Sequence, residues 1–539
     1  MQNGRYGTIL ISGVVGFALL ALSCASTSVT PEKQPAGPAA DQPRQGGILT
    51  QYFGGDPPSF DLHQESTSAA NLSASPAYNQ LVIYDPLEPT KVKPDLATSW
   101  QVSPDGKTYT FQLAKDVKFH NGNALTAADA KFSLERVMSP PKGIRSPRQG
   151  AYSIVERVEA PDDATLRVVL KQPAPSLIMN LAVGYMAVYD KEFAETKGQN
   201  AFEKEVMGSG PFRFKEYIRG VSMEVERNKE YWVKDRPYLD GIKIFIIPDR
   251  NTALAAFRSG QLHIFSLTAD DLKNLGPDLT SKVTVQETMS YGHRGVDINV
   301  RKKPFDDPRV RQAVSLAIDR NAALKVLYLG EGKIGGYMPP HGQWGVSPEE
   351  LAKIPGYGPN KASEIEQAKQ LLSEAGFPSG FQTTITTRKL TSYEDVMVFA
   401  VDQLAKVGIK AQTKILETTQ AYDAMSQGDF ELGTWVYGVQ TDDPDGIFGE
   451  HIICGAVRNY SGFCDKEVDA LFNKQSQTLN VEERKKLVQE IERKALTLGG
   501  RVILRGGIGR PTLWNEVKNF KAHPDGDNNS KFQDVWMSK

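Results

Sequence analysis

The sequence predicts an α/β fold built from about three structural units. Between residues 298 and 505, segments with apolar residues at helical spacing alternate with strand-like segments, and this alternation is typical of an α/β domain. Residues 91–207 read instead as strands, turns and short helices. The chain has 539 residues. Because a domain takes roughly 150 residues, this length suits three units rather than one.

Residues 93–136 carry the clearest local pattern. Residues 104–106 (PDG) predict a turn, because proline fixes φ and glycine accepts a positive φ. The following strand alternates apolar and polar residues, which places Tyr109, Phe111 and Leu113 on one buried face. A strand bounded by turns and followed by a helix is therefore expected here.

Two helices have clear start signals. Thr126 with Asp129 three residues later resembles a capping box. Asp307 is an expected N-cap, and Pro308 takes the first helical position. The residues after Pro308 form an apolar stripe: Val310, Ala313, Val314, Ala317 and Ile318. The arginines of this segment are predicted to lie on a solvated helix face: Arg309, Arg311 and Arg320.

Spacing predicts the remaining elements. Strands are expected at 239–247, 408–416 and 430–437, and helices at 252–259 and around 398–407. One further helix is indicated by apolar residues at helical spacing: Ile365, Ala368, Leu371, Leu372 and Ala375.

The N-terminus predicts export. Residues 9–22 are apolar or small, follow Arg5 and end in the letters LALSC. A bilayer span needs about 20 apolar residues, so residues 1–23 are interpreted as a signal peptide. The Cys at the end resembles a bacterial lipobox, which makes Cys24 the expected lipid anchor. The alternative is a conventional signal peptide with an unmodified cysteine.

Charge and motifs exclude several function classes. Lys and Arg number 63 against 64 Asp and Glu, so nothing attracts nucleic acid or acidic lipid. The seven histidines show no ligand spacing, and no nucleophile elbow, Walker motif or dinucleotide fingerprint is present. We therefore expect no catalytic residues, no metal and no cofactor, although a triad assembled in space stays open.

Two cysteines remain after Cys24. Cys454 and Cys464 lie close together in a loop-like stretch, and an exported compartment is oxidising. A disulfide is the favoured interpretation. Two separate reduced thiols or a metal-binding pair are the alternatives.

Several segments together resemble the peptide/nickel solute-binding proteins of ABC importers (family 5). They are residues 93–136, 56–61 (DPPSFD), 208–212 (GSGPF) and 304–320. The resemblance covers residues 48–539. It implies a type II periplasmic-binding-protein-like fold, with two lobes joined by a hinge and an additional domain inserted in the first lobe.

The resemblance also implies a domain plan and partners. Domain I comprises 48–90, 208–297 and 506–539, domain II comprises 91–207, and domain III comprises 298–505. Residues 24–47, rich in Pro, Ala, Ser, Thr and Gly, form a flexible tether. The expected protein is a monomer in the periplasm or on the outer face of a bacterial membrane, working with an ABC permease and ATPase.

Three regions match ligand-facing loops of this family. They supply the predicted ligand-binding residues Ser66, Thr67, Thr418, Thr434, Tyr437, Gln440 and Asp443. Peptide-binding members have an Asp at the position of Gln440, which holds the α-ammonium of the peptide. The neutral amide here indicates that this position holds a free N-terminus poorly.

This difference from the peptide-binding members leaves more than one class of ligand possible. The expected solute is a peptide held mainly through its backbone, or a neutral or anionic polar solute such as a modified peptide or oligosaccharide. Asp442 or Asp443 is a substitute for the missing carboxylate, unless Asp443 only shapes its loop. The alternatives are a receptor for a non-peptide solute such as a metal chelate, a sensor with the same fold, and a secreted hydrolase.

Overall fold

The computed structural model describes residues 42–88, 91–439, 441–504 and 508–538. Residues 43–539 form one compact unit. The predicted signal peptide, Cys24, most of the tether and Gln440 lie outside the described residues.

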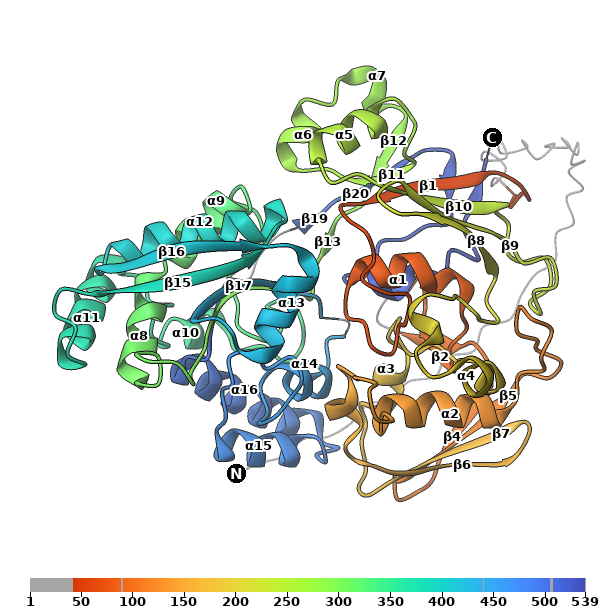
Figure 1. The fold of residues 1–539 in the computed structure, drawn as a ribbon, viewed down its shortest axis with the longest axis horizontal. Helices are drawn as coiled ribbons and strands as arrows, with labels where there is room; N and C mark the ends of the chain where they lie inside the picture. Colours follow the sequence, from red (N-terminus) through yellow and green to blue (C-terminus); the bar gives the residue numbers. More distant parts are fainter. Residues whose placement is uncertain (1–41, 89–90, 440, 505–507, 539) are drawn as a thin grey trace, which may run out of the picture. The chain divides into compact units, whose positions relative to one another are not determined.

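We keep the names first domain and third domain for the segments to which the sequence analysis assigned them. The segments of the first domain contain a four-stranded sheet in the order β1-β10-β9-β8 (Figure 1). β1 (Ile48–Phe53) runs parallel to β10 (Gly241–Ile246), and the other pairs are antiparallel. Leu49, Ile242 and Ile244 lie in its hydrophobic core. The other strands are β8 (Phe212–Ile218) and β9 (Ser222–Arg227).

The C-terminal segment returns to this first domain. Its strand β20 (Pro511–Trp514) lies between β11 (Ile264–Ser266) and β12 (Val283–Val285) in a three-stranded sheet. α5 (Arg250–Arg258) packs against this small sheet through Phe257. Two other short segments of the first domain are α1 (Ser68–Ala74) and β2 (Val82–Tyr84).

The close approach of two backbone segments explains why residues 208–212 (GSGPF) contain two glycines. A Cβ atom on Gly208 would lie 2.0 Å from the carbonyl oxygen of Ala77, and one on Gly210 would lie 2.4 Å from the carbonyl carbon of the same residue. Any side chain at either position would collide with this backbone. The sequence predicts a tight turn, but the glycines are needed for packing rather than for a positive φ.

Residues 91–207 contain a separate antiparallel sheet in the order β4-β5-β7-β6. α2 (Ala127–Met138) packs over it, and the predicted capping box of Thr126 and Asp129 is present. Tyr109, Phe111 and Leu113 are all buried, as predicted. The strands are β4 (Ala97–Val102), β5 (Thr108–Leu113), β6 (Val155–Asp162) and β7 (Thr165–Leu170).

The third domain has a five-stranded sheet in the order β16-β15-β17-β14-β18. Its strands are β14 (His293–Ile298), β15 (Phe381–Arg388), β16 (Ile409–Leu416), β17 (Leu432–Tyr437) and β18 (Arg501–Leu504). β14 pairs with β17 and β18, so the expected boundary between residues 297 and 298 falls inside a strand of this sheet.

Helices cover the sheet of the third domain (Figure 1). α8 (Pro308–Ala317), α11 (Lys361–Glu374) and α12 (Thr391–Ala405) share one core with β14, β15 and β17. α12 starts seven residues before the predicted helix, because Tyr393, Val396 and Met397 also bury their side chains. The remaining helices are α13 (Thr418–Gln427), α14 (Pro444–His451), α15 (Lys466–Gln475) and α16 (Val481–Leu498).

The predicted solvated face of the arginines is wrong for Arg320. Its side chain is buried, donates to the carbonyl oxygens of Ile503 and Gly356, and stacks 3.9 Å from the ring of Tyr357. Arg309 is exposed as expected. Buried carbonyl groups from distant segments therefore replace water around Arg320.

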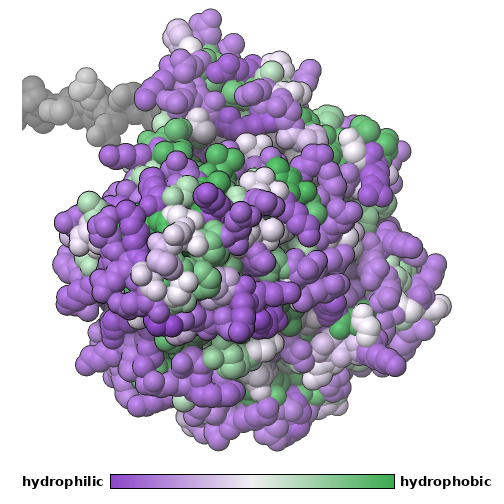
Figure 2. All heavy atoms as spheres, turned by 60° about the vertical axis from the view of Figure 1, so that its left-hand side comes forward, coloured by the Kyte–Doolittle hydropathy of each residue, from purple (hydrophilic) through white to green (hydrophobic). Residues whose placement is uncertain are grey.

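One disulfide lies in the described part of the third domain. Cys454 and Cys464 are joined by an S–S bond of 2.08 Å. On the face shown in Figure 2, hydrophilic side chains predominate and apolar ones are scattered. Among the described residues, no helix is long and apolar enough to cross a membrane, and no cluster of His, Cys, Asp and Glu could hold a metal ion.

Candidate ligand-binding site

A cavity of about 650 Å³ lies between segments of the first and third domains. One wall comes from residues 52–53, 66–68, 266–268 and 524–527. The opposite wall comes from β14, from the ends of β15 and β17, and from residues that follow them. This volume is within the range of about 300–1,000 Å³ that small-ligand sites have.

A second cavity of about 750 Å³ adjoins the first. It is lined by residues 54–60 on one side and by residues 389–391 and 417–419 on the other. Leu390 lines both cavities, so its side chain lies where they meet.

Tyr437 is fixed at the end of β17 by a buried polar cluster. Its hydroxyl group donates to Asp297 (2.6 Å) and accepts from Arg501 (2.7 Å), and its ring lies 5.1 Å from that of His293. Burial raises the pKa of Tyr437 well above its usual value, so the phenol stays neutral. The cluster therefore holds the ring rigidly at the cavity.

Two arginines that line the cavity have no acidic partner. Arg388, at the end of β15, donates from Nε to Thr418 (3.0 Å) and lies 5.4 Å from the ring of Tyr393. Arg294 lies 4.9 Å from the ring of Tyr328. Within the described ranges, neither guanidinium group pairs with a carboxylate. An arginine fork of this kind is suited to a carboxylate supplied by a ligand.

Other arginines at the cavity are already paired. Arg250 pairs with Asp271, and Arg510 pairs with Glu287 and Glu331. Arg458 donates from Nη1 to Glu450 (2.9 Å), but its buried Nε has no hydrogen-bond partner in the described part of the chain.

The acidic side of the cavity comes from the C-terminal segment. Asp527 accepts from the hydroxyl groups of Tyr185 (2.7 Å) and Ser68 (3.1 Å). Among the residues that the structure describes, Asp525 accepts one hydrogen bond, from the N–H of Asp527 (2.8 Å). Burial raises the pKa of both carboxyl groups, and most strongly that of Asp525.

The structure separates the predicted site residues into groups. Ser66, Thr67 and Tyr437 line the 650 Å³ cavity, and Thr67 also caps α1 by accepting from the N–H of Ala70. Thr418 lines the adjoining cavity. Gln440 is not described.

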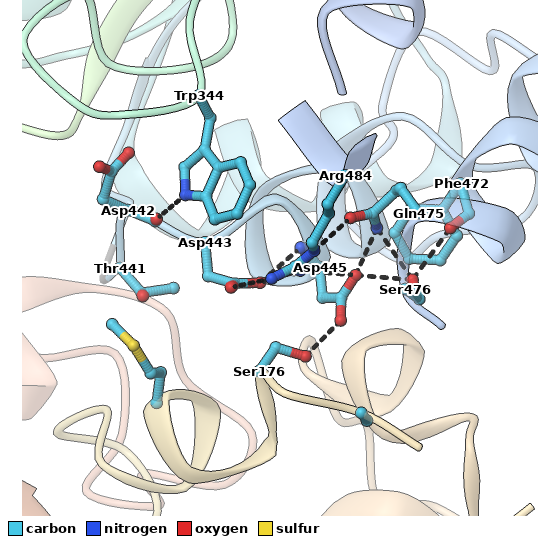
Figure 3. Close-up of polar contacts among 12 residues, drawn as sticks. Ser176, Trp344, Thr441, Asp442, Asp443, Asp445, Phe472, Gln475, Ser476 and Arg484 are labelled. Atoms are coloured by element: carbon cyan, nitrogen blue, oxygen red, sulfur yellow. Dashed lines mark hydrogen bonds and ion pairs between the residues drawn. The ribbon is translucent and has the colours of Figure 1, made fainter. Parts of the chain in front are cut away.

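The two other predicted residues line neither cavity. Thr434 is fully buried in the sheet and donates to the hydroxyl group of Thr387 (2.7 Å). Asp443 caps α14 by accepting from the N–H of Asp445. Its carboxylate also pairs with Arg484 (3.1 Å; Figure 3), which favours the interpretation that Asp443 shapes its loop.

The cluster around Asp443 also joins two domains. Ser176, from the sheet domain of residues 91–207, donates to the carboxylate of Asp445 (Figure 3). Trp344 donates to the backbone oxygen of Asp442 (2.7 Å) and is buried. Trp344 and Trp435 both lie in the core and not at the cavity.

Sequence reasoning did not identify Arg294, Arg388, Arg458 or Asp525. Arg388 is the last residue of β15, whose pairing with β17 places it near the predicted site residue Tyr437, but the sequence alone does not show this pairing. The other three lie in segments without a motif.

Comparison with known proteins gives consistent matches. A family model described as bacterial extracellular solute-binding proteins, family 5 Middle, matches residues 91–456. Heme-binding protein A of Haemophilus influenzae is 28% identical over 85% of this chain and 86% of its own length. The glutathione-binding protein GsiB of Pectobacterium atrosepticum is 31% identical over 70% of this chain and 71% of its own.

Solved structures match over nearly the whole fold. The periplasmic binding protein DppA of Helicobacter pylori, in complex with the peptide STSA, has a TM-score of 0.82 and 26% identity, covering 92% of this chain and 99% of its own. AgaA of A. tumefaciens, in complex with agropinic acid, has a TM-score of 0.81 and 25% identity, covering 91% and 99%. These matches confirm the predicted α/β, type II periplasmic-binding-protein-like fold.

Proposed function

Because the chain belongs to the bacterial extracellular solute-binding proteins of family 5, we propose that it captures a peptide or peptide-like solute for an ABC importer. The solute occupies the 650 Å³ cavity, and the receptor then delivers it to the permease. The receptor carries out no chemistry. It acts as a monomer in the periplasm or on the outer face of a bacterial membrane.

The observation that carries this proposal is that two arginines line one cavity and pair with no carboxylate among the described residues. Arg294 and Arg388 offer guanidinium groups to a carboxylate, and polar groups of Ser66 and Thr67 face them from the other wall. Tyr393 and Tyr437 also line the cavity, although the ring of Tyr437 is fully buried against His293 and Arg501. A short peptide supplies a carboxylate, amide groups and apolar side chains together.

The relatives support the same class of solute. Their names and titles specify glutathione, di- and tripeptides and the peptide STSA as ligands, besides heme and agropinic acid. A cavity of this volume suits peptides of a few residues.

Native mass spectrometry of the purified protein tests the proposal. We expect a population with added mass, and fragmentation of the released solute should give a peptide or an amino-acid conjugate. Adding an enzymatic casein hydrolysate to protein stripped of ligand should raise the thermal unfolding temperature, because a ligand that binds only the folded state stabilises it. A released oligosaccharide or metal chelate, with no response to the hydrolysate, would contradict the peptide assignment.

We also propose that Cys24 is acylated and that residues 24–47 tether the receptor to the membrane. Stable anchoring needs more than one acyl chain, since each buried CH₂ contributes about 0.8 kcal/mol and a single chain binds only marginally. Cys24→Ala is expected to move the protein from the membrane fraction to the soluble fraction. Ser23→Ala, which keeps a small residue before the cysteine, is the matched control and should stay in the membrane. Retention of the Cys24→Ala protein would rule out this anchor.

A further inference from the structure

Asp525 is a buried carboxylate without a cation. It lies on the C-terminal segment that returns to the first domain, and it lines the 650 Å³ cavity. Its side chain is 9% exposed. It accepts one hydrogen bond, from the N–H of Asp527, and forms no ion pair with any residue that the structure describes. An ionised carboxylate in this state is costly unless a cation is supplied, and burial accordingly raises the pKa of Asp525.

The neighbouring charged groups already have partners within the protein. Asp527 is held by Tyr185 and Ser68. Arg148 donates to the backbone oxygen of Glu65 (2.8 Å), and its guanidinium carbon lies 3.9 Å from the ring centre of Tyr185. Among the described residues no arginine forms an ion pair with Asp525, although the positive charges of Arg458 and Arg148 partly counteract the rise of its pKa.

Arg458 provides an independent sign of an occupant. It lines the same cavity from the opposite wall, it is 3% exposed, and its Nε has no hydrogen-bond partner among the described residues. Arg458 forms no ion pair with Asp525 among the described residues. The carboxylate of Asp525 can therefore still accept, and Nε of Arg458 can still donate, a hydrogen bond. A ligand group that carries a cation next to a carbonyl oxygen would satisfy both.

We propose that Asp525 binds the ammonium group of the ligand, with Arg458 Nε donating to the adjacent carbonyl oxygen. The ligand is then a peptide or amino-acid conjugate with a free amino group. This subsite lies on the first domain, and it replaces the carboxylate that Gln440 does not supply from the third. The inference rests on the proposed function and specifies which end of the solute is held.

The test compares amine-bearing and amine-blocked ligands on the whole exported protein. Ligand-free protein is incubated with an enzymatic casein hydrolysate, either untreated or fully acetylated, and the retained peptides are identified by mass spectrometry. One retained peptide is then measured by calorimetry in both forms. We expect only amine-bearing peptides to be retained, with acetylation weakening binding about thirtyfold or more.

Variants assign the effect to Asp525. Asp525→Asn and Asp525→Ser both keep an oxygen for the N–H of Asp527, and each should lose about thirtyfold in affinity for the free amine and little for the acetylated peptide. Measuring two variants, each checked by thermal unfolding, prevents a folding defect in one from deciding the result. Asp534→Asn, in the same segment but away from this cavity, should bind like the unmodified protein.

The outcomes distinguish this inference from the proposed function. Equal retention of acetylated and free peptides, or unchanged discrimination in both Asp525 variants, would overturn the ammonium subsite and leave the peptide receptor standing. Retention of no peptide at all would overturn both.

Discussion

Replacing Arg501 with methionine is expected to lower the free energy of unfolding by about 3–5 kcal/mol. Arg501 and Asp297 are almost fully buried and form an ion pair of 2.7 Å. Removing the guanidinium group leaves Asp297 as an uncompensated buried charge, and the hydroxyl group of Tyr437 loses one of its two partners. Denaturant unfolding followed by circular dichroism measures the loss.

Arg309→Met is the matched control for this prediction. Arg309 also pairs with an aspartate of the third domain, Asp307, but the pair is at the surface. Exposed pairs contribute about 0–1 kcal/mol, so the two variants should differ by at least about 2 kcal/mol. Equal and small losses in both variants would show that Asp297 is not held by Arg501.

The position of Tyr437 in the sheet explains why this buried cluster matters for binding. β17 pairs with β14, and His293 lies directly opposite Tyr437 in the register. The ring is held by stacking on His293 and by two hydrogen bonds at its hydroxyl group. The ring is fully buried, with His293 stacked on it and the guanidinium carbon of Arg501 3.7 Å from its centre, so the cluster fixes the end of β17, which lines the cavity.

Local signals in the sequence predicted the elements that local physics controls. The capping box at Thr126 and the Asp307–Pro308 helix start depend on residues within three positions of each other, and both are present. The burial of Arg320 could not be predicted in this way. Its partner Ile503 lies 183 residues away, so the environment exists only once β18 is placed.

In the candidate site, too, contacts between distant segments decide which residues reach the cavity. Tyr437 was predicted from the resemblance of its segment to a ligand-facing region of the family, and it does line the cavity. Thr434, three residues earlier, lies inside the strand, where Thr387 of β15 and Tyr393 of α12 cover it. Asp525 reaches the cavity only because the C-terminal segment returns to the first domain, and no local pattern predicts that return.

Arg388→Met is expected to weaken binding of the solute by about thirtyfold to several thousandfold, which corresponds to about 2–5 kcal/mol. Its guanidinium group is largely buried, lines the cavity and pairs with no carboxylate in the described chain. A solute carboxylate would be its first ionic partner. Because Nε of this group donates a hydrogen bond to Thr418, the loss of folding stability should be about 0.5–1.5 kcal/mol.

Calorimetry with a peptide identified from the purified protein measures this loss of affinity. Arg250→Met is the control, because Arg250 lines the same cavity but its charge is already paired with Asp271. If the carboxylate of the solute binds Arg388, amidation of the peptide's C-terminus should weaken binding to the unmodified protein and have little effect on the Arg388→Met variant. Equal losses on amidation in both proteins would place the carboxylate elsewhere, and Arg294 would then be the remaining arginine of the cavity that the structure leaves without an acidic partner among its described residues.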